Sequence, residues 1–250
     1  MISCNITYYN DPKWLLWWHT TFTRLYLEGI DIQLNIADDG SQVYPAEDFF
    51  DQFMPSPNMH LFRVTEDIGF NSHGARNLLM KQTQTEWNML SDIDREYPTQ
   101  TLKSIIQAER EDKLKKGEYY CYSHETNGEA SCNEYLVSKT DFWRSGGYDE
   151  EFVNIHWGDR IFFDESLSRV AKRVHKTEWK LRYTRGAREW LWTDNPTTIY
   201  PDDKTILHPY NDWSTTERRE ALIQKIKTRN RTHEGRMSKK VINFEWEQVF

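Results

Sequence analysis

Segments with strand character alternate with segments of helical character through the first part of this chain, and this alternation limits the fold more than any other feature. The strand-like runs span residues 3–9, 30–37, 59–64 and 85–90, and helix-like apolar spacing lies between them at 12–29, 45–53 and 71–82. Regular succession of strand and helix is typical of a parallel sheet covered by helices on both faces. The sequence therefore predicts an α/β fold with a doubly wound, mostly parallel, Rossmann-like sheet.

The rest of the chain is less regular. We expect a helix over 101–111, strands over 118–123 and 134–138, a helix and turn over 141–152, a helix over 159–174, a strand over 179–183 and a helix over 215–228. Between residues 184 and 213 the apolar periodicity is poor, and long loops of that kind are usually functional or disordered. We predict one core domain over residues 1–185, followed by an extension over 186–250 with an aromatic-rich loop and a basic helix and tail.

Composition sets the broad class of protein. The chain has 250 residues, enough for a sizeable core, and its net charge of −7 argues against nucleic acid wrapped over the whole surface. The three cysteines, Cys4, Cys121 and Cys132, form no metal-binding spacing and leave an odd thiol, which favours a reducing compartment. No basic-then-apolar signal opens the chain, and no apolar run approaches the length of a membrane span. These features predict a cytoplasmic protein.

Two carboxylates, Asp92 and Asp94, follow the strand-like run at 85–90. In open α/β sheets, ligands bind outside the carboxyl ends of the strands. Two carboxylates one residue apart repel each other unless a cation neutralises them, and hard oxygen ligands suit Mg²⁺ or Mn²⁺. The alternative is a pair of solvated loop acids, which is the commoner outcome for such a motif on its own.

Several short segments in a fixed order resemble one family. They are Tyr9-Asn10, Ile36-Ala37-Asp38-Asp39-Gly40-Ser41, Gly74-Ala75-Arg76-Asn77, Leu90-Ser91-Asp92-Ile93-Asp94, Gly146-Gly147-Tyr148-Asp149-Glu150-Glu151-Phe152 and Trp157-Gly158-Asp159. Each segment alone is ordinary, but the ordered set resembles the family 2-like glycosyltransferases of the GT-A fold, over roughly residues 3–170. The resemblance fades beyond residue 185.

The resemblance implies a nucleotide-sugar donor held at the ends of the first, second and fourth strands. Asp39 is then expected to accept a hydrogen bond from the base, most simply the N3–H of uracil, since an ionised carboxylate only accepts. Arg76 is expected to support the nucleotide through its planar fork, Thr7 and Tyr9 to line the same pocket, and Asp92 to contact the ribose or a metal-bound water. The competing interpretations are a plain polar turn around Asp39 and a surface helix arginine at position 76.

The resemblance also implies a divalent metal, Mn²⁺ or Mg²⁺, bridging the donor diphosphate. Asp94 is the expected ligand, with Asp92 beside it. His208 is a candidate third ligand, because some proteins of this fold complete the metal site with a late histidine, and imidazole suits Mn²⁺ better than Mg²⁺. The alternative for His208 is a structural histidine.

The acceptor side of the expected site centres on Asp159, which stands where the family has its catalytic base. Trp157 and Gly158 precede it and are expected to form an acceptor wall. The family often reads Gly-Glu-Asp at this point, whereas this chain reads Gly-Asp-Arg. Asp159 can therefore occupy the neighbouring position, which leaves Asp164 as a second candidate base, and a plain helix N-cap is the bland interpretation of Asp159.

These implications favour a metal-dependent, inverting glycosyltransferase that acts on a hydroxyl group. The acceptor is a saccharide or, as an alternative, a hydroxylated base in DNA. The DNA alternative is suggested by basic side chains near the C-terminus, namely Lys225, Lys227, Arg229, Arg231, Arg236, Lys239 and Lys240, which can equally form a solvated face. Sugar nucleotidyltransferases use a glycine-rich loop near the N-terminus, and residues 1–20 contain no glycine. A non-catalytic carbohydrate- or nucleic-acid-binding relative is the third class.

Overall fold

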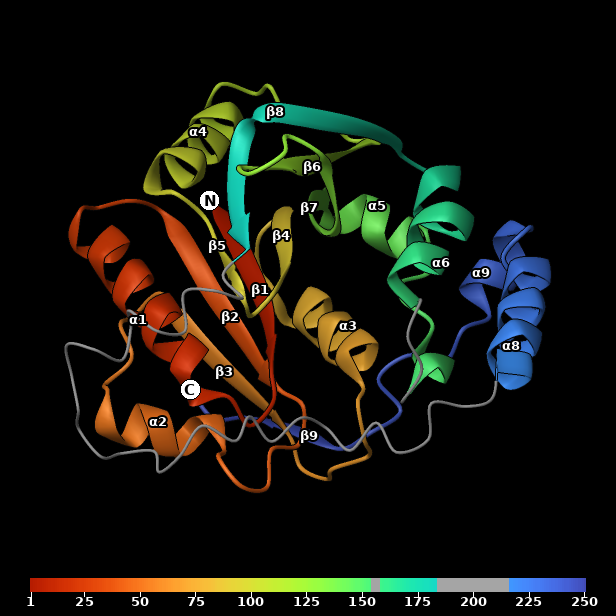
Figure 1. Ribbon diagram of the computed structural model, residues 1–250, viewed down its shortest axis with the longest axis horizontal. Coiled ribbons are helices and arrows are strands. Elements are labelled where there is room, and N and C mark those ends of the chain that lie inside the picture. The colour runs from red at the N-terminus through yellow and green to blue at the C-terminus, as the bar shows by residue number, and fades with distance from the viewer. Residues whose placement is uncertain (154–157, 184–215) are drawn as a thin grey trace.

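A computed structural model describes residues 1–153, 158–183 and 216–250. A mixed sheet forms the centre of the molecule, and its strands lie in the order β5-β8-β6-β7-β4-β1-β2-β3-β9 (Figure 1). The predicted α/β class and doubly wound sheet are confirmed.

Four parallel strands form the predicted Rossmann-like half of the sheet. They are β1 (Ile2–Tyr8), β2 (Ile32–Asp38), β3 (Met59–Val64) and β4 (Trp87–Asp92). β1 lies between β2 and β4, and the register pairs Thr7 with Ala37 on one side and with Asp92 on the other. The three strands therefore end level with one another, and the residues that follow them meet at one edge of the sheet.

The other half of the sheet is largely antiparallel. β7 (Ala130–Ser138) pairs antiparallel with both β4 and β6 (Glu118–His124), and the long β8 (Lys172–Tyr183) runs parallel to β6. Two short strands close the edges: β5 (Arg95–Glu96) on β8, and β9 (Trp246–Gln248) on β3. β9 belongs to the C-terminal extension, so part of that extension completes the core sheet.

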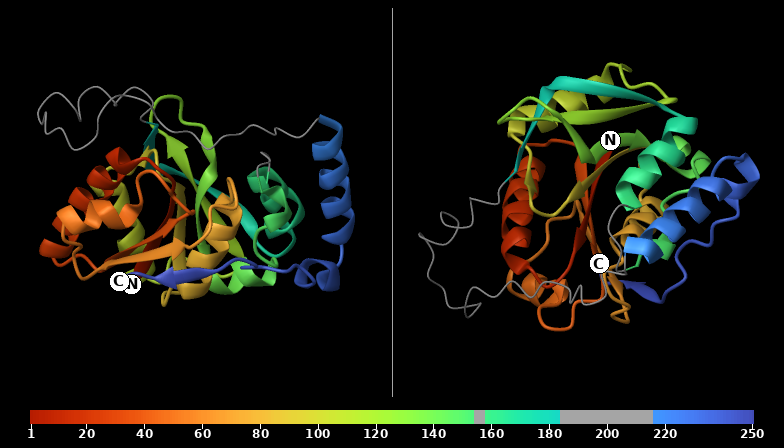
Figure 2. Two further views of the ribbon diagram at one scale, coloured as in Figure 1. Left: turned by 90° about the horizontal axis from the view of Figure 1, so that it is seen from below. Right: turned by 45° about the vertical axis from the view of Figure 1, so that its right-hand side comes forward.

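Helices cover both faces. α1 (Pro12–Leu27), α2 (Ala46–Gln52) and α4 (Thr99–Arg110) contribute to the largest apolar cluster on one face. α3 (Ser72–Gln82), α5 (Lys139–Arg144) and α6 (Gly158–Glu165) lie on the other, and α8 (Thr216–Arg229) and α9 (His233–Met237) lie outside α6 (Figure 2, left). No helix in the described ranges is both long and apolar enough to cross a membrane.

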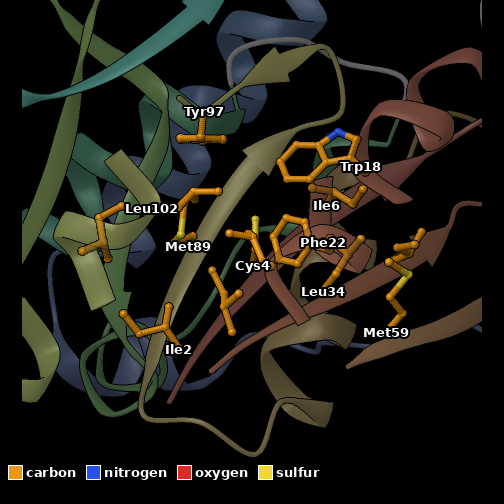
Figure 3. Close-up of a cluster of buried hydrophobic side chains, with 14 of the residues drawn as sticks. Ile2, Cys4, Ile6, Trp18, Phe22, Leu34, Met59, Met89, Tyr97 and Leu102 are labelled. Atoms are coloured by element: carbon orange, nitrogen blue, oxygen red, sulfur yellow. The ribbon is translucent and has the colours of Figure 1, made fainter. Parts of the chain in front are cut away.

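The main core is built from alternate residues of the central strands. Cys4 and Ile6 of β1 point toward Trp18 and Phe22 of α1, and all four side chains are fully buried (Figure 3). Burying a large apolar side chain contributes about 1.5–3 kcal/mol. This packing fixes α1 against the sheet, and the Trp18 indole N–H donates to Ile93 O (2.8 Å), just beyond the end of β4.

The segment predicted as one helix over 159–174 forms three elements instead. α6 ends at Glu165, a 3₁₀ turn follows as η2 (Leu167–Arg169), and β8 begins at Lys172. Residues 172–175 form a strand because they pair with β6. The stretch is polar, so this long-range pairing gives no local signal in the sequence. The segment expected as helix and turn over 141–152 consists of α5, two glycines with positive φ at 146 and 147, and η1 (Glu150–Phe152).

Candidate active site

The turn after β2 holds two buried carboxylates with different surroundings. Asp38 accepts hydrogen bonds from the backbone N–H groups of Ser41 (2.9 Å) and Ala46 (2.8 Å), and so closes the turn. Asp39 accepts one from the Asn71 N–H through Oδ2 (2.8 Å), while its buried Oδ1 has no hydrogen-bond partner within the described residues. Burial raises the pKa of the Asp39 carboxyl well above its usual range. A buried acceptor without a protein partner is usually satisfied by ordered water or by a ligand.

Tyr9 lies beside this turn. Its hydroxyl donates to Asp67 Oδ2 (2.9 Å), and burial together with Asp67 and the Asp39 charge raises its pKa to about 12. Thr7 of β1 pairs in register with Asp92 of the adjacent strand β4. The residues expected to line a donor pocket thus occur at the ends of adjacent strands.

Arg76 connects two of the predicted site acids. It lies on α3, a helix whose first turn is capped by the Asn71 side chain at Gly74 N–H (3.2 Å), and it is only 1% exposed. Its Nη2 donates to Asp92 Oδ1 (2.5 Å), and its Nη1 donates to Asp159 Oδ1. The interpretation as a surface arginine is therefore wrong, and the guanidinium holds Asp92 and Asp159 at its two ends.

Asp159 lies in the first turn of α6 and faces inward. Tyr148 donates its hydroxyl to Oδ1 (3.0 Å), and His73 Nε2 lies 3.7 Å from Oδ2. Burial alone raises a carboxyl pKa, but Arg76 and His73 outweigh it and hold the pKa of Asp159 well below its usual range. The Asp159 side chain is 24% exposed, so the carboxylate keeps access to solvent. Close contact with the His73 ring also explains the preceding glycine, since a Cβ at Gly158 would lie 2.1 Å from His73 Cε1.

Asp94 lies on the far side of Asp92 and pairs with the next residue, Arg95. Arg95 also reaches Asp92 Oδ2 through Nη2 (3.4 Å) and Glu134 Oε1 through Nε (2.6 Å). Asn133 Nδ2 donates to Asp92 Oδ2 (3.3 Å). Burial raises the pKa of Asp94, and burial together with the Asp92 charge raises that of Glu134 to about 7. Four carboxylates and two guanidiniums therefore form one continuous chain of ion pairs from Glu134 to Asp159.

Among the described residues, the second candidate base, Asp164, does not join this cluster. Asp164 is exposed and pairs with Arg160 one turn earlier on α6 (3.5 Å). Trp157 and His208 lie outside the described residues. Within residues 1–153, 158–183 and 216–250, no three acidic, histidine or cysteine side chains converge as a ready metal cluster.

Comparison with known proteins gives structural matches only. No family model and no curated protein matches the sequence. S. aureus TarS, residues 1–349, superposes with a TM-score of 0.59 at 12% identity, over 72% of this chain and 59% of that one. The fold is the GT-A fold of family 2-like glycosyltransferases. The structure of the same TarS fragment in complex with UDP-GlcNAc matches with the same TM-score and identity, over 72% of this chain and 57% of that one.

Mannosyltransferase PcManGT from Pyrobaculum calidifontis, in complex with GDP-Man and Mn²⁺, shares this GT-A fold. It superposes with a TM-score of 0.54 at 12% identity, over 76% of this chain and 59% of that one. The chain thus spans about three fifths of the length of these matched structures. Identity this low establishes the GT-A fold alone.

Four residues of this ion-pair cluster and its surroundings were not assigned roles from the sequence: His73, Tyr148, Arg95 and Glu134. Tyr148 belongs to the Gly-Gly-Tyr-Asp-Glu segment, and Arg95 directly follows Asp94, so both stood beside a recognised motif. His73 and Glu134 carry no such signal, because each reaches the site through packing between distant segments.

Three of the seven basic C-terminal residues pair with acids of the core. Lys225 and Arg229 pair with Glu151, and Arg229 also pairs with Asp149. Lys239 is buried and lies 3.3 Å from Asp149. These three cations are paired within the chain, which makes them less available to a polyanion.

Proposed function

We propose that this protein is a metal-dependent glycosyltransferase that transfers a sugar from a nucleotide sugar, with a UDP-sugar favoured, to a hydroxyl acceptor. The chain of ion pairs from Glu134 to Asp159 carries the proposal. It places Asp92, expected on the donor side, one guanidinium away from Asp159, the acid expected on the acceptor side, and Asp94 two guanidiniums away. Transfer needs one group for the leaving diphosphate and another for the acceptor proton, close together.

The turn after β2 supports the donor assignment. The unpaired Oδ1 of Asp39 is suited to a base edge that offers an N–H, as uracil does at N3. Adenine and cytosine present an unprotonated ring nitrogen at the equivalent edge and leave this acceptor unsatisfied. Tyr9 and Thr7 bound the same end of the sheet and are proposed to contact the nucleoside.

The donor set also fits a divalent cation in its chemistry. With all groups ionised, the four carboxylates of the ion-pair chain exceed the two guanidiniums by two negative charges, as many as one Mn²⁺ or Mg²⁺ neutralises. Asp94 and Asp92 are proposed to hold it, and His208 stays a proposed third ligand outside the described residues. Such an ion offsets the charge that develops on a departing diphosphate.

Asp159 is proposed to accept the proton of the acceptor hydroxyl. Arg76 and Tyr148 fix one carboxylate oxygen, and the low pKa keeps the group ionised at neutral pH. A weak base of this kind takes the proton late, when bond formation to the sugar has made the hydroxyl acidic. Attack from the side of Asp159, with the diphosphate leaving on the side of Asp94, inverts the anomeric centre.

A binding screen tests the proposal. Thermal shift with UDP-, GDP- and TDP-sugars, each with and without Mn²⁺, is expected to show stabilisation by a UDP-sugar with Mn²⁺. A ligand that binds only the native state contributes about 2.7 kcal/mol at a hundredfold excess over its dissociation constant. Asp39→Ala and Asp94→Ala are expected to lose the shift, the first by losing the base contact and the second the metal. No shift with any nucleotide sugar sinks the transferase interpretation.

The acceptor is proposed to be a saccharide hydroxyl. A hydroxylated DNA base requires a phosphate-binding face, and the pairing of Lys225, Arg229 and Lys239 with core acids weakens that alternative. Acceptor binding that falls steeply with salt would restore it, because each neutralised phosphate releases counterions.

A further inference from the structure

The two carboxylate oxygens of Asp159, the proposed base, have different surroundings. Oδ1 accepts from Arg76 Nη1 and from the Tyr148 hydroxyl (3.0 Å). A carboxylate oxygen has about two lone pairs, so these two donors occupy it. Among the residues that the structure describes, none donates to Oδ2 within hydrogen-bond distance, and His73 Nε2 lies 3.7 Å from it. Oδ2 is therefore the oxygen that keeps a lone pair for the proton of an acceptor.

Packing fixes the His73 ring beside this oxygen. The ring stacks on Tyr148, with centroids 5.1 Å apart and planes at 30°, and it meets Phe152 edge-on at 5.9 Å. Gly158 leaves room for the ring, and the His73 residue is only 3% exposed. Tyr148 thus supports both partners, His73 through its ring and Asp159 through its hydroxyl.

His73 Nε2 is buried and makes no hydrogen bond with any residue that the structure describes. Most buried polar nitrogens have a partner, and Asp159 Oδ2 is the acceptor that faces this one. A proton on Nε2 is favoured here, because otherwise a nitrogen lone pair would face a negatively charged oxygen. Hydrogen bonds of catalytic groups are often long before substrate binds and shorten in the complex. The 3.7 Å separation is therefore one that acceptor binding can close.

We propose that His73 is a positioning residue for the base, and that its Nε2–H donates to Asp159 Oδ2 once an acceptor hydroxyl binds. This inference rests on the proposed function, since it names Oδ2 as the oxygen that takes the proton. One lone pair of Oδ2 then faces His73, and the other is left for the hydroxyl. The O–H bond breaks as the proton bonds to Oδ2. The hydroxyl oxygen bonds to the anomeric carbon, and the diphosphate leaves with the electrons of the broken carbon–oxygen bond. His73 keeps its own proton throughout.

Two substitutions separate positioning from packing. His73→Phe keeps an aromatic ring against Tyr148 and Phe152 but has no N–H, whereas His73→Gln keeps an N–H and loses the ring. The assay is release of UDP from the UDP-sugar that stabilises the protein most, with Mn²⁺ and with water as acceptor. In His73→Phe, kcat is expected to fall about tenfold with the KM of the UDP-sugar unchanged, the equivalent of one hydrogen bond to a charged group. In His73→Gln, kcat is expected to stay near the wild-type value. A packing role predicts the reverse order.

His19→Phe is the matched control. His19 lies on α1, on the opposite face of the sheet from Asp159. Its ring also packs against aromatic side chains, Phe49 and Phe53, and its Nε2 lies 3.0 Å from Met54 O. The same substitution there is expected to leave kcat unchanged, which separates an effect on the base from a general effect of losing a buried imidazole.

Equal losses of kcat in both His73 variants, or no loss in His73→Phe, overturn the inference and leave the proposed function intact. If the wild type neither hydrolyses nor transfers from any UDP-sugar, the proposed function itself fails, and the positioning role fails with it. If a His73 variant does not fold, ¹⁵N NMR of labelled histidine in the wild type and in Asp159→Asn takes its place. His73 Nε2 should then carry a proton, and its resonance should shift in Asp159→Asn. An unprotonated Nε2, or one that does not respond, overturns the inference.

Discussion

Asp39 and Asp159 are both largely buried carboxylates, but their surroundings shift their pKa values in opposite directions. Among the described residues, Asp39 has one backbone donor and no neighbouring cation, so burial dominates and raises its pKa. Asp159 has Arg76 and His73, which outweigh burial and lower its pKa. Opposite pKa shifts suit the two acids to different tasks. Asp39 can change its ionisation when a ligand binds, whereas Asp159 stays ionised.

Nucleotide binding should release a proton from Asp39. An N–H from the base stabilises the ionised carboxylate, so binding lowers a pKa that burial holds high. Affinity is then expected to rise with pH until the pH exceeds the raised pKa. Calorimetric titration with UDP in buffers of different ionisation enthalpy should give different heats for the wild type. Asp39→Asn can still accept a hydrogen bond but cannot titrate, so its heats should agree across buffers. Identical wild-type heats would contradict this role.

Turnover should depend on Asp159 and not on Asp164. Asp159→Asn removes the proton acceptor, and we expect a loss of roughly a hundred- to ten-thousandfold in kcat with UDP-sugar binding retained. Asp164→Asn makes the same change on the exposed side of the same helix and should leave kcat near the wild-type value. Full activity in the Asp159 variant, or an equal loss in both, would exclude Asp159 as the base.

At the scale of elements, the Gly-Gly-Tyr-Asp-Glu segment connects the C-terminal extension to the site. Glu150 accepts from Ile242 N–H (2.7 Å) in the extension and from Asn77 Nδ2 (2.8 Å) on α3. Asn77 Oδ1 in turn accepts from Tyr148 N–H (2.9 Å). The extension is thus connected by hydrogen bonds to the helix that carries Arg76 and to the turn that carries Tyr148.

Lys239 should make stability depend on pH. Its Nζ is buried against Gly147 O (2.8 Å), and burial followed by the charges of Arg229 and Arg236 lowers its pKa to about 7. Asp149 lies 3.3 Å away but already pairs with Arg229, so it does not restore the cation. An unfolded lysine has a pKa of about 10.4, so between about pH 7 and 10 the native state holds fewer protons. The free energy of unfolding therefore rises with pH through this window.

Urea unfolding of the wild type and Lys239→Met at pH 7 and pH 9 checks this effect. Other groups titrate in the same range, so the quantity of interest is the difference between the two proteins at each pH. The wild type should gain stability relative to the variant as the pH rises. A difference that is constant with pH would mean that Lys239 stays protonated against Asp149.

At the scale of the whole molecule, sequence reasoning succeeded where structure is local or periodic. β1 to β4 and their helices were predicted because each strand carries its own apolar signal. It failed at β8, whose N-terminal half is polar and becomes a strand only through pairing with β6. The acids Asp92, Asp94 and Asp159 were singled out because each lies in a short motif. The contacts of Glu134 with Arg95 and of His73 with Asp159 were not predicted. These contacts depend on the three-dimensional arrangement and leave no spacing to read.

The predicted division at residue 185 can be tested by separating the two parts. β9 pairs with β3, and the buried Asp149 depends on Arg229 for its charge balance. A fragment of residues 1–185 should therefore leave a buried carboxylate unpaired, which costs about 3–5 kcal/mol out of a typical stability of about 5–15 kcal/mol. We expect the fragment to melt well below the full chain, or without a cooperative transition.

Asp149→Asn distinguishes this electrostatic cause from the simple loss of packing. In the full chain the substitution breaks ion pairs and should destabilise. In the fragment it removes an uncompensated buried charge and should stabilise. Circular dichroism melts are recorded for the full chain and the fragment, each with and without Asp149→Asn. Comparing the melting temperatures shows whether the substitution destabilises the full chain and stabilises the fragment. If the fragment melts at the temperature of the full chain, residues 1–185 are an independent unit and the extension only an appendage. If Asp149→Asn destabilises both forms equally, the acid is held by the core alone, and the cations of the extension do not stabilise it.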